Sequence, residues 1–231
     1  MKVAILFSGG KDSTFSIYKA KMAGHEVVCL VTIFPQSEES ELLHYPNIQF
    51  TKLQSESMNI PQISIKVDST NPNSEVTTLE EILIQGKEKF EIQGIVHGGI
   101  LSEFQRKQFE QISQSLGITL ISPLWKKNEK EYMENLLESK FHFILISVTS
   151  DGLDESWLGK EITKEDLITL ENLSKKYGFN LSFEGGEAET FVTDCPLFSY
   201  AIKIVKSKKI WDGYRGRFEI LEAKLDNHAK G

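Results

Sequence analysis

The sequence contains few of the features that assign a protein directly to a functional class. Of its 231 residues only two are cysteines, Cys29 and Cys195, and neither lies in a Cys-x-x-Cys or Cys/His cluster. A disulfide framework or a zinc site is therefore not expected. No apolar run approaches the ~18 residues of a membrane span, and the polar residues 8–13 cut off the apolar start, unlike in a signal peptide. We expect a cytoplasmic protein without a membrane partner.

Basic residues are also in the minority. The chain has 26 Lys and Arg against 33 Asp and Glu, which gives a net charge of −7. This balance argues against a broad nucleic-acid surface, so no direct nucleic-acid partner is expected. Nucleotide binding stays open, because it needs only backbone amides and a few cations. Hydrophobic residues at 40% and charged residues at 26% are typical of a globular protein and exclude a disordered or collagen-like chain.

What the first half does contain is an alternation of short apolar runs and longer helix-like segments. Runs of this kind separated by helices predict crossovers between parallel strands, and therefore an α/β fold with a mainly parallel five-stranded sheet covered on both faces. The expected strands are 2–7, 26–33, 62–66, 94–98 and 118–121, and the expected helices are 12–23, 46–59, 75–91 and 101–116.

Pro123 marks an expected boundary between a first domain at residues 1–122 and a smaller α/β subdomain at residues 123–231. In the second part the pattern predicts helices at 128–139 and 164–177 and strands at 141–149, 199–211 and 217–224. The last two strands are expected to form an antiparallel pair.

The strongest motif is Ser-Gly-Gly-Lys-Asp-Ser at residues 8–13, between the first strand and the first helix. Adjacent glycines permit a tight turn with unshielded backbone amides, and the helix N-terminus adds its dipole, so the loop is suited to a phosphate. Lys11 would add a mobile positive charge, and Asp12 would hold a magnesium ion shared with the phosphates. A Walker A loop is excluded because it would need glycine where Ile5 stands. The alternative is an ordinary strand–helix turn with an N-cap.

A second motif holds four carboxylates within eleven residues, around Gly185 and Gly186. They belong to Glu184, Glu187, Glu189 and Asp194. Such a cluster needs cations, hydrogen bonds or water to offset its repulsion. It would serve to hold a cationic substrate group, magnesium or an amine, and the alternative is a solvated acidic loop.

Residues 8–13 resemble the pyrophosphate loop of the N-type ATP pyrophosphatases, which have a five-stranded parallel sheet and cleave ATP between the α and β phosphates. Residues 184–190, Glu-Gly-Gly-Glu-Ala-Glu-Thr, resemble the signature of the diphthine–ammonia ligase family, which makes the last amide of diphthamide on elongation factor 2. Ala188 stands where that family usually carries Tyr or Phe. Further matches follow in order over residues 1–200, at 24–27, 44–48, 60–61, 98, 102–106, 123–125 and 152–159.

The resemblance implies an ATP-dependent ligase that converts diphthine on elongation factor 2 to diphthamide with ammonia, through an acyl-adenylate, releasing AMP and pyrophosphate. It implies ATP and Mg²⁺ as cofactors, with Mg²⁺ on Asp12. The implied catalytic residues are Lys11, Asp12, Glu187 and Glu189. ATP would be held by Ser8, Gly9, Gly10, Lys11, Asp12, Ser13, Gly98 and Arg106. The acceptor would be bound by His44, Ser102, Gln105, Glu184, Gly185, Gly186, Glu187, Glu189, Thr190 and Asp194.

Spacing supports part of this set, because Ser102, Gln105 and Arg106 follow at i, i+3 and i+4 and share one helix face. That face lies near the C-terminal edge of a parallel strand, where α/β sheets bind ligands. A surface Arg106 paired with Glu103 or Glu110 is the alternative.

Other functions stay open at this point. A pyrophosphatase of the same family could adenylate a different carboxylate, and a tRNA-thiolating enzyme would need reactive cysteines, of which the sequence gives little sign. A non-catalytic nucleotide sensor is disfavoured by the carboxylate cluster. Free ammonia is the expected nitrogen source, because no glutaminase segment is visible, and a homodimer is possible.

Overall fold

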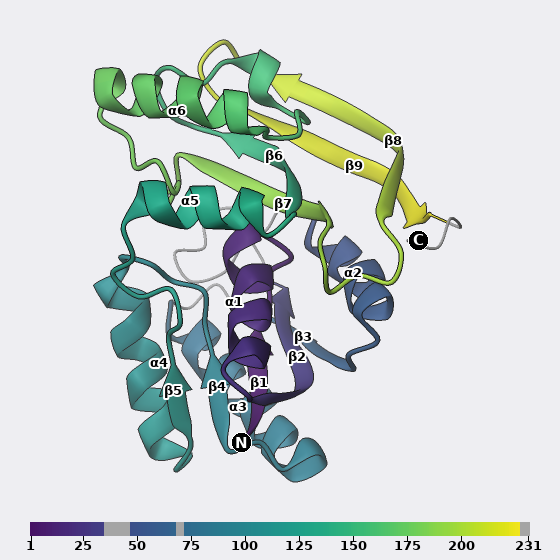
Figure 1. Ribbon diagram of the computed structural model, residues 1–231. Coiled ribbons are helices and arrows are strands. Elements are labelled where there is room, and N and C mark those ends of the chain that lie inside the picture. The colour runs from purple at the N-terminus through teal and green to yellow at the C-terminus, as the bar shows by residue number, and fades with distance from the viewer. Residues whose placement is uncertain (35–46, 68–71, 227–231) are drawn as a thin grey trace. The chain divides into compact units, whose positions relative to one another are not determined.

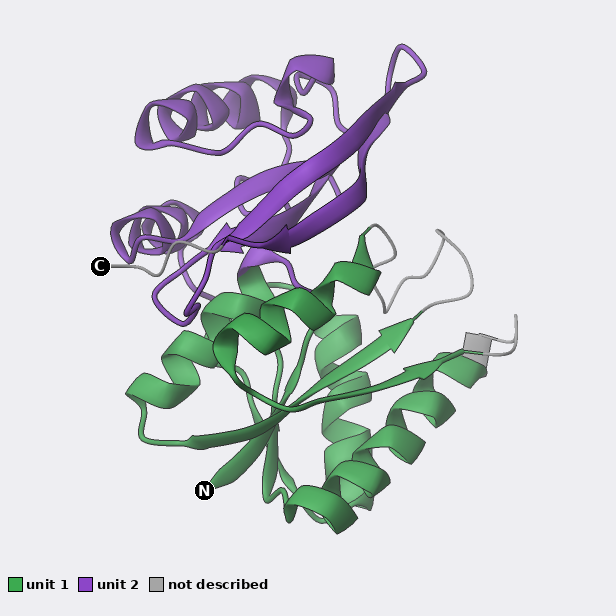
Figure 2. Ribbon diagram, turned by 90° about the vertical axis from the view of Figure 1, so that its right-hand side faces the viewer, with its two compact units in different colours: residues 1–8, 12–125 green, residues 9–11, 126–231 purple. Residues whose placement is uncertain are grey.

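The computed structural model describes residues 1–34, 47–67 and 72–226, and its chain divides into two compact units (Figure 1). The first unit holds residues 1–8 and 12–125, and the second holds residues 9–11 and 126–231 (Figure 2). By its contacts, therefore, a three-residue piece of the N-terminal glycine loop belongs with the C-terminal half of the chain.

The first unit is built on a five-stranded parallel sheet in the order β3-β2-β1-β4-β5. The predicted sheet is thereby confirmed. Its strands are β1 (Lys2–Leu6), β2 (Glu26–Phe34), β3 (Gln62–Lys66), β4 (Gly94–Val96) and β5 (Thr119–Ile121). Its helices are α1 (Lys11–Met22), α2 (Thr51–Met58), α3 (Pro72–Phe90) and α4 (Glu103–Ser115), with the short 3₁₀ helix η1 (Ile48–Phe50) before α2.

Helices cover this sheet on both faces, as alternating side chains in a strand require. Ala4 points into a buried cluster that α3 and α4 close, together with alternate residues of β2 such as Cys29 and Val31. Val3 and Ile5 point to the opposite face, where α1 lies (Figure 1). Cys29 is fully buried, as expected of a core residue, and burial raises the pKa of its thiol to about 12.

The strand order places a topological switch between β1 and β4. From β1 the chain continues through α1 to β2 on one side, whereas β4 and β5 lie on the other side. Sheets of this kind bind ligands outside the carboxyl ends of the strands at the switch point. The loop after β1 and the loop after β4 leave the sheet there.

The second unit is built on an antiparallel sheet in the order β7-β6-β9-β8. Its strands are β6 (His142–Val148), β7 (Ala188–Asp194), β8 (Ile202–Trp211) and β9 (Gly216–Leu225). Its helices are α5 (Glu129–Glu138) and α6 (Lys164–Tyr177), with the 3₁₀ helix η2 (Glu155–Trp157) between β6 and α6. The predicted antiparallel pair β8–β9 is confirmed, but β7 is a strand that the pattern did not predict.

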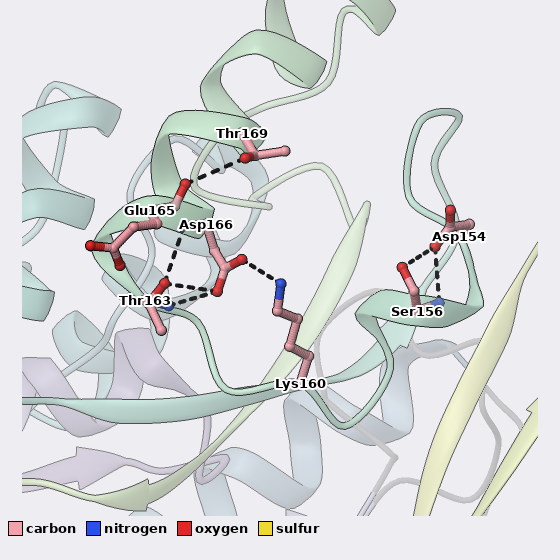
Figure 3. Close-up of polar contacts among 7 residues, drawn as sticks. All are labelled: Asp154, Ser156, Lys160, Thr163, Glu165, Asp166 and Thr169. Carbon is pink, nitrogen blue, oxygen red and sulfur yellow. Dashed lines mark hydrogen bonds and ion pairs between the residues drawn. The ribbon is translucent and has the colours of Figure 1, made fainter.

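A capping box fixes the start of α6 (Figure 3). The Thr163 hydroxyl accepts a hydrogen bond from the Asp166 amide, and the Asp166 carboxylate accepts one from the Thr163 amide in return. The Lys160 ammonium pairs with the same carboxylate. The box satisfies backbone donors that the first turn of a helix leaves open.

No helix among the described residues is both long enough and apolar enough to cross a membrane.

Candidate functional site

The glycine loop after β1 closes on itself through two serines. The Ser8 amide donates to the Ser13 hydroxyl oxygen at 3.3 Å, and the two hydroxyl oxygens lie 3.2 Å apart. Because α1 begins at Lys11, Asp12 and Ser13 lie in its first turn, where backbone amides and the helix dipole favour an anion. Two hydroxyls and a helix N-terminus are thus placed at the switch point, and a helix N-terminus favours an anion.

The piece of this loop that belongs to the second unit runs along the free edge of β7. The Val192 amide donates to the Gly9 carbonyl at 3.0 Å, and the Lys11 amide donates to the Thr190 hydroxyl at 3.0 Å. An edge strand offers such unpaired backbone groups to any neighbouring chain segment. The two motifs that the sequence singled out are therefore joined by direct hydrogen bonds.

The Lys11 side chain is buried, with 1% of its surface exposed. Its ammonium donates to the Ser182 carbonyl at 2.6 Å and lies 5.6 Å and 5.7 Å from the ring centroids of Tyr132 and Phe183. Carbonyl oxygens and ring faces are the partners that make burial of a cation tolerable. The expectation that Lys11 adds a mobile positive charge is therefore wrong.

Glu187 holds a turn together. One carboxylate oxygen accepts from the Asn180 amide at 2.8 Å and from its side-chain nitrogen at 2.7 Å, and the other accepts from the Gly185 amide at 2.8 Å. Three N–H donors on one carboxylate offset the repulsion that the sequence left unexplained. Glu187 therefore has a structural task in the turn before β7, whatever else it does.

The remaining residues of the acidic motif do not gather into one cluster. Glu189 and Thr190 are consecutive in β7, so their side chains leave opposite faces of the strand. The Asp194 carboxylate accepts from the Cys195 amide at 2.8 Å, Glu184 is half-buried, and Gly185 and Gly186 are exposed. Within the described ranges no group of three or more His, Cys, Asp or Glu side chains is placed to hold a metal ion.

Gly98 lies where the loop after β4 meets the first turn of α1. A Cβ atom at this position would lie 2.7 Å from the Asp12 carbonyl carbon and 2.8 Å from the Ser13 nitrogen. No real Cβ atom makes contacts this short, so only glycine fits here. Gly98 was predicted to bind ATP, and what the structure adds is that its lack of a side chain lets α1 start beside β4.

His97, which the sequence did not single out, orders the same loop. The Gly99 amide donates to His97 Nδ1 at 3.1 Å, so the proton lies on Nε2, which is 2.7 Å from the Ser122 hydroxyl. Burial, together with the nearby Arg106 cation, lowers the pKa of His97 to about 4, and the ring is neutral at pH 7. The loop after β4 is thus tied to the end of β5 by an uncharged imidazole.

The start of α4 holds the other residues predicted from spacing. Ser102 is the N-cap, and its hydroxyl accepts from the Gln105 amide at 3.3 Å. Arg106 donates to the Glu110 carboxylate at 2.9 Å, and its guanidinium lies 4.7 Å from the centroid of the Trp125 ring. The pairing of Arg106 with Glu110 is therefore present, and its half-exposed side chain is placed at the carboxyl end of the sheet.

His44, predicted to bind the acceptor, lies outside the described residues. Four residues around Lys11 were missed by sequence reasoning: Glu129, Tyr132, Ser182 and Phe183. No motif carries them, because Tyr132, Ser182 and Phe183 contact Lys11 only in the tertiary fold, and Glu129 is connected to it through Ser182. His97 could have been noticed, since it stands between a buried strand and a pair of glycines.

Comparison with known proteins gives matches over almost the whole chain. Residues 1–120 match the model described as the diphthamide synthase N-terminal domain, and residues 128–225 match the one described as its C-terminal domain. The diphthine–ammonia ligase of Bos taurus is 36% identical over 91% of this chain and 85% of its own length, and that of Homo sapiens is 34% identical with the same coverage. A solved structure described as the predicted subunit of a tRNA methyltransferase from Methanocaldococcus jannaschii is 18% identical, covers 85% of this chain and 98% of its own, and has a TM-score of 0.44.

Proposed function

Since this chain belongs to the diphthamide synthase family, we propose that it is a diphthine–ammonia ligase that uses ATP to convert the carboxylate of diphthine on elongation factor 2 into the amide of diphthamide. The observation that carries the proposal is the hydrogen bonding of Gly9 and Lys11 to Val192 and Thr190. It joins the phosphate-loop motif, which suits nucleotide activation, to the acidic motif typical of the family.

The proposed reaction has two steps. A carboxylate oxygen of diphthine attacks the α phosphorus of ATP, the bond between that phosphorus and the bridging oxygen to the β phosphate breaks, and pyrophosphate leaves. Ammonia then attacks the acyl carbon of the acyl-adenylate, the bond from that carbon to the AMP oxygen breaks, and a proton leaves the nitrogen. Both steps depend mainly on positioning and on stabilising charge on the phosphates.

The residues of the loop fit the first step. The Ser8 and Ser13 hydroxyls and the amides of the first turn of α1 would hold the leaving pyrophosphate. Asp12 would hold Mg²⁺, which commonly takes one or two carboxylates and completes its shell with substrate phosphates and water. The donor that the loop itself offers for this role is the single Asp12 carboxylate, in the first turn of α1. Bound there, Mg²⁺ would neutralise charge on the phosphates.

Glu187 and Glu189, both assigned to the acceptor, differ in their surroundings. Glu187 is engaged by three N–H donors of its own turn, so it would shape the site rather than move protons. Glu189 is then the better candidate of the two to orient ammonia or the trimethylammonium of diphthine. Both cysteines are buried, which disfavours the tRNA-thiolating alternative, since sulfur transfer needs an accessible thiolate.

The experiment combines the protein with ATP, Mg²⁺, isotope-labelled ammonium and elongation factor 2 carrying diphthine. We expect the label in the diphthamide peptide by mass spectrometry, and AMP and pyrophosphate in equal amount. Asp12→Asn should lose most of this activity, whereas Asp151→Asn, at an exposed turn, should keep it. AMP formation without labelled peptide would point to another carboxylate acceptor, and ATP binding without AMP would point to a nucleotide sensor.

A further inference from the structure

We propose that Glu129 is a positioning residue for the glycine loop, and that it acts through Ser182 and the buried ammonium of Lys11. The inference rests on the proposed use of residues 8–13 as a phosphate site. In this proposal the buried Lys11 side chain anchors the glycine loop and does not contact phosphate directly.

The argument starts from the anchoring of Gly9–Lys11. Hydrogen bonds within the second unit hold this segment: from the Val192 amide to the Gly9 carbonyl, from the Lys11 amide to the Thr190 hydroxyl, and from the Lys11 ammonium to the Ser182 carbonyl. Gly9 has a φ of +82°, in the left-handed region that glycine adopts without strain. The backbone of this segment and the Lys11 side chain are therefore both held by hydrogen bonds, which restricts the conformation of the loop.

The ammonium bond depends on where the Ser182 carbonyl points. Ser182 is fully buried, and its amide and hydroxyl both donate to the same oxygen of Glu129, each at 2.8 Å. Two hydrogen bonds to one carboxylate fix the orientation of Ser182. Hydrogen bonds to a charged acceptor are among the stronger ones in proteins. Glu129 thus aims the Ser182 carbonyl at Lys11.

The backbone at Phe183, directly after Ser182, has an unfavourable conformation. Phe183 has a φ of +62°, which is rare for a bulky side chain and costs of order 1–3 kcal/mol. The conformation keeps the Phe183 ring near the Lys11 ammonium, beside the Ser182 carbonyl. A strained residue persists where its surroundings fix it, and here the preceding residue, Ser182, is held by Glu129 while the Phe183 amide donates to the Asn180 carbonyl.

We call the series of contacts from Glu129 through Ser182 to Lys11 the relay. The variants that test it are Glu129→Ala, Glu129→Gln, Lys11→Met and the double variant Glu129→Ala/Lys11→Met. Glu131→Ala is the matched control, because it removes the same charge from the first turn of α5 at an exposed position. Hydrogen exchange by mass spectrometry on the full-length protein without nucleotide reports the loop directly. Calorimetry with an ATP analogue that carries a methylene between the α and β phosphates, plus Mg²⁺, reports its use.

We expect Glu129→Ala to speed exchange in residues 9–11 and to weaken analogue binding about tenfold, near the cost of one lost hydrogen bond. Glu129→Gln should restore most of the binding, because its amide oxygen can accept both Ser182 bonds. The double variant should bind no more weakly than Lys11→Met alone, since the relay is already cut. Glu131→Ala should match the wild type.

Three results would overturn the relay: unchanged exchange at residues 9–11 in Glu129→Ala, losses that add in the double variant, or an equal loss in Glu131→Ala. If Lys11→Met does not fold, the Glu129 series with its Gln rescue still decides. A wild type that binds no analogue would refute the proposed function, whereas the exchange data would still judge the positioning role.

Discussion

Replacing Gly98 by alanine adds one methyl group at the contact between the loop after β4 and the start of α1. The new Cβ would lie 2.7 Å from the Asp12 carbonyl carbon, 2.8 Å from the Ser13 nitrogen and 2.9 Å from the Asp12 carbonyl oxygen. Carbon atoms in contact prefer about 3.5–4.0 Å, and all three neighbours are backbone atoms of a helical turn, so the helix itself must shift. Overpacking of this kind costs about 1–3 kcal/mol, and we expect the free energy of unfolding to fall by that amount.

Gly86→Ala is the matched control, in the same unit and with the same added methyl. Gly86 lies inside α3, where its Cβ would meet only the side-chain tips of Ile92 and Ile63, at 3.4 Å and 3.5 Å. Alanine in a helix interior is more stable than glycine by about 0.5–1 kcal/mol. Urea unfolding followed by circular dichroism should therefore shift in opposite directions for the two variants. A Gly98→Ala protein as stable as the wild type would refute the close-packing argument.

Three further predictions concern single side chains. The pKa of His97 is lowered from 6.5 to about 4, so as the pH falls from 6.5 to 4 the unfolded chain binds a proton before the folded protein does, and the free energy of unfolding decreases. The full shift corresponds to about 3 kcal/mol. Urea unfolding of His97→Asn should lack this component of the pH dependence. Glu187→Gln turns an NH₂ group toward an N–H donor of its turn, which should cost about 1–3 kcal/mol and lower the melting temperature, and an unchanged temperature would contradict the structural task of Glu187. Thr163→Ala removes the N-cap of α6 and should cost about 1 kcal/mol, measurable by thermal unfolding, with Thr169→Ala inside the helix as the control.

The sheet of the first unit was predictable because its central strands, β1, β2 and β4, are largely buried and read as apolar runs. The strand β7 was not, because its first residues alternate acidic and small side chains after a Gly-Gly pair, a pattern typical of loops. Its strand conformation comes from pairing with β6, for example Val192 with Phe143, and tertiary pairing of this kind overrides local preference.

The motifs of the site could be predicted from the sequence, but the contacts that their side chains make could not. A lysine in a glycine-rich loop before a helix suggests a phosphate ligand, yet Lys11 reaches a carbonyl 171 residues further along the chain. A count of carboxylates suggests a charged cluster, yet the Glu187 carboxylate accepts hydrogen bonds from backbone amides that the composition does not reveal. In both residues the deciding partner is a backbone group, and backbone groups carry no sequence signal.

The assignment of Gly9–Lys11 to the second unit also sets a timetable for biosynthesis. The chain emerges from the ribosome N-terminus first, so all five parallel strands are made by residue 121, whereas the partners of Gly9 and Lys11 follow only at residues 182–192. A nascent chain halted in between has its sheet and its Ser-Gly-Gly-Lys-Asp-Ser segment, but it lacks the Ser182, Thr190 and Val192 partners of Gly9 and Lys11. The loop therefore matures last, although it was synthesised among the first residues, and a half-made chain cannot yet hold it in its native form.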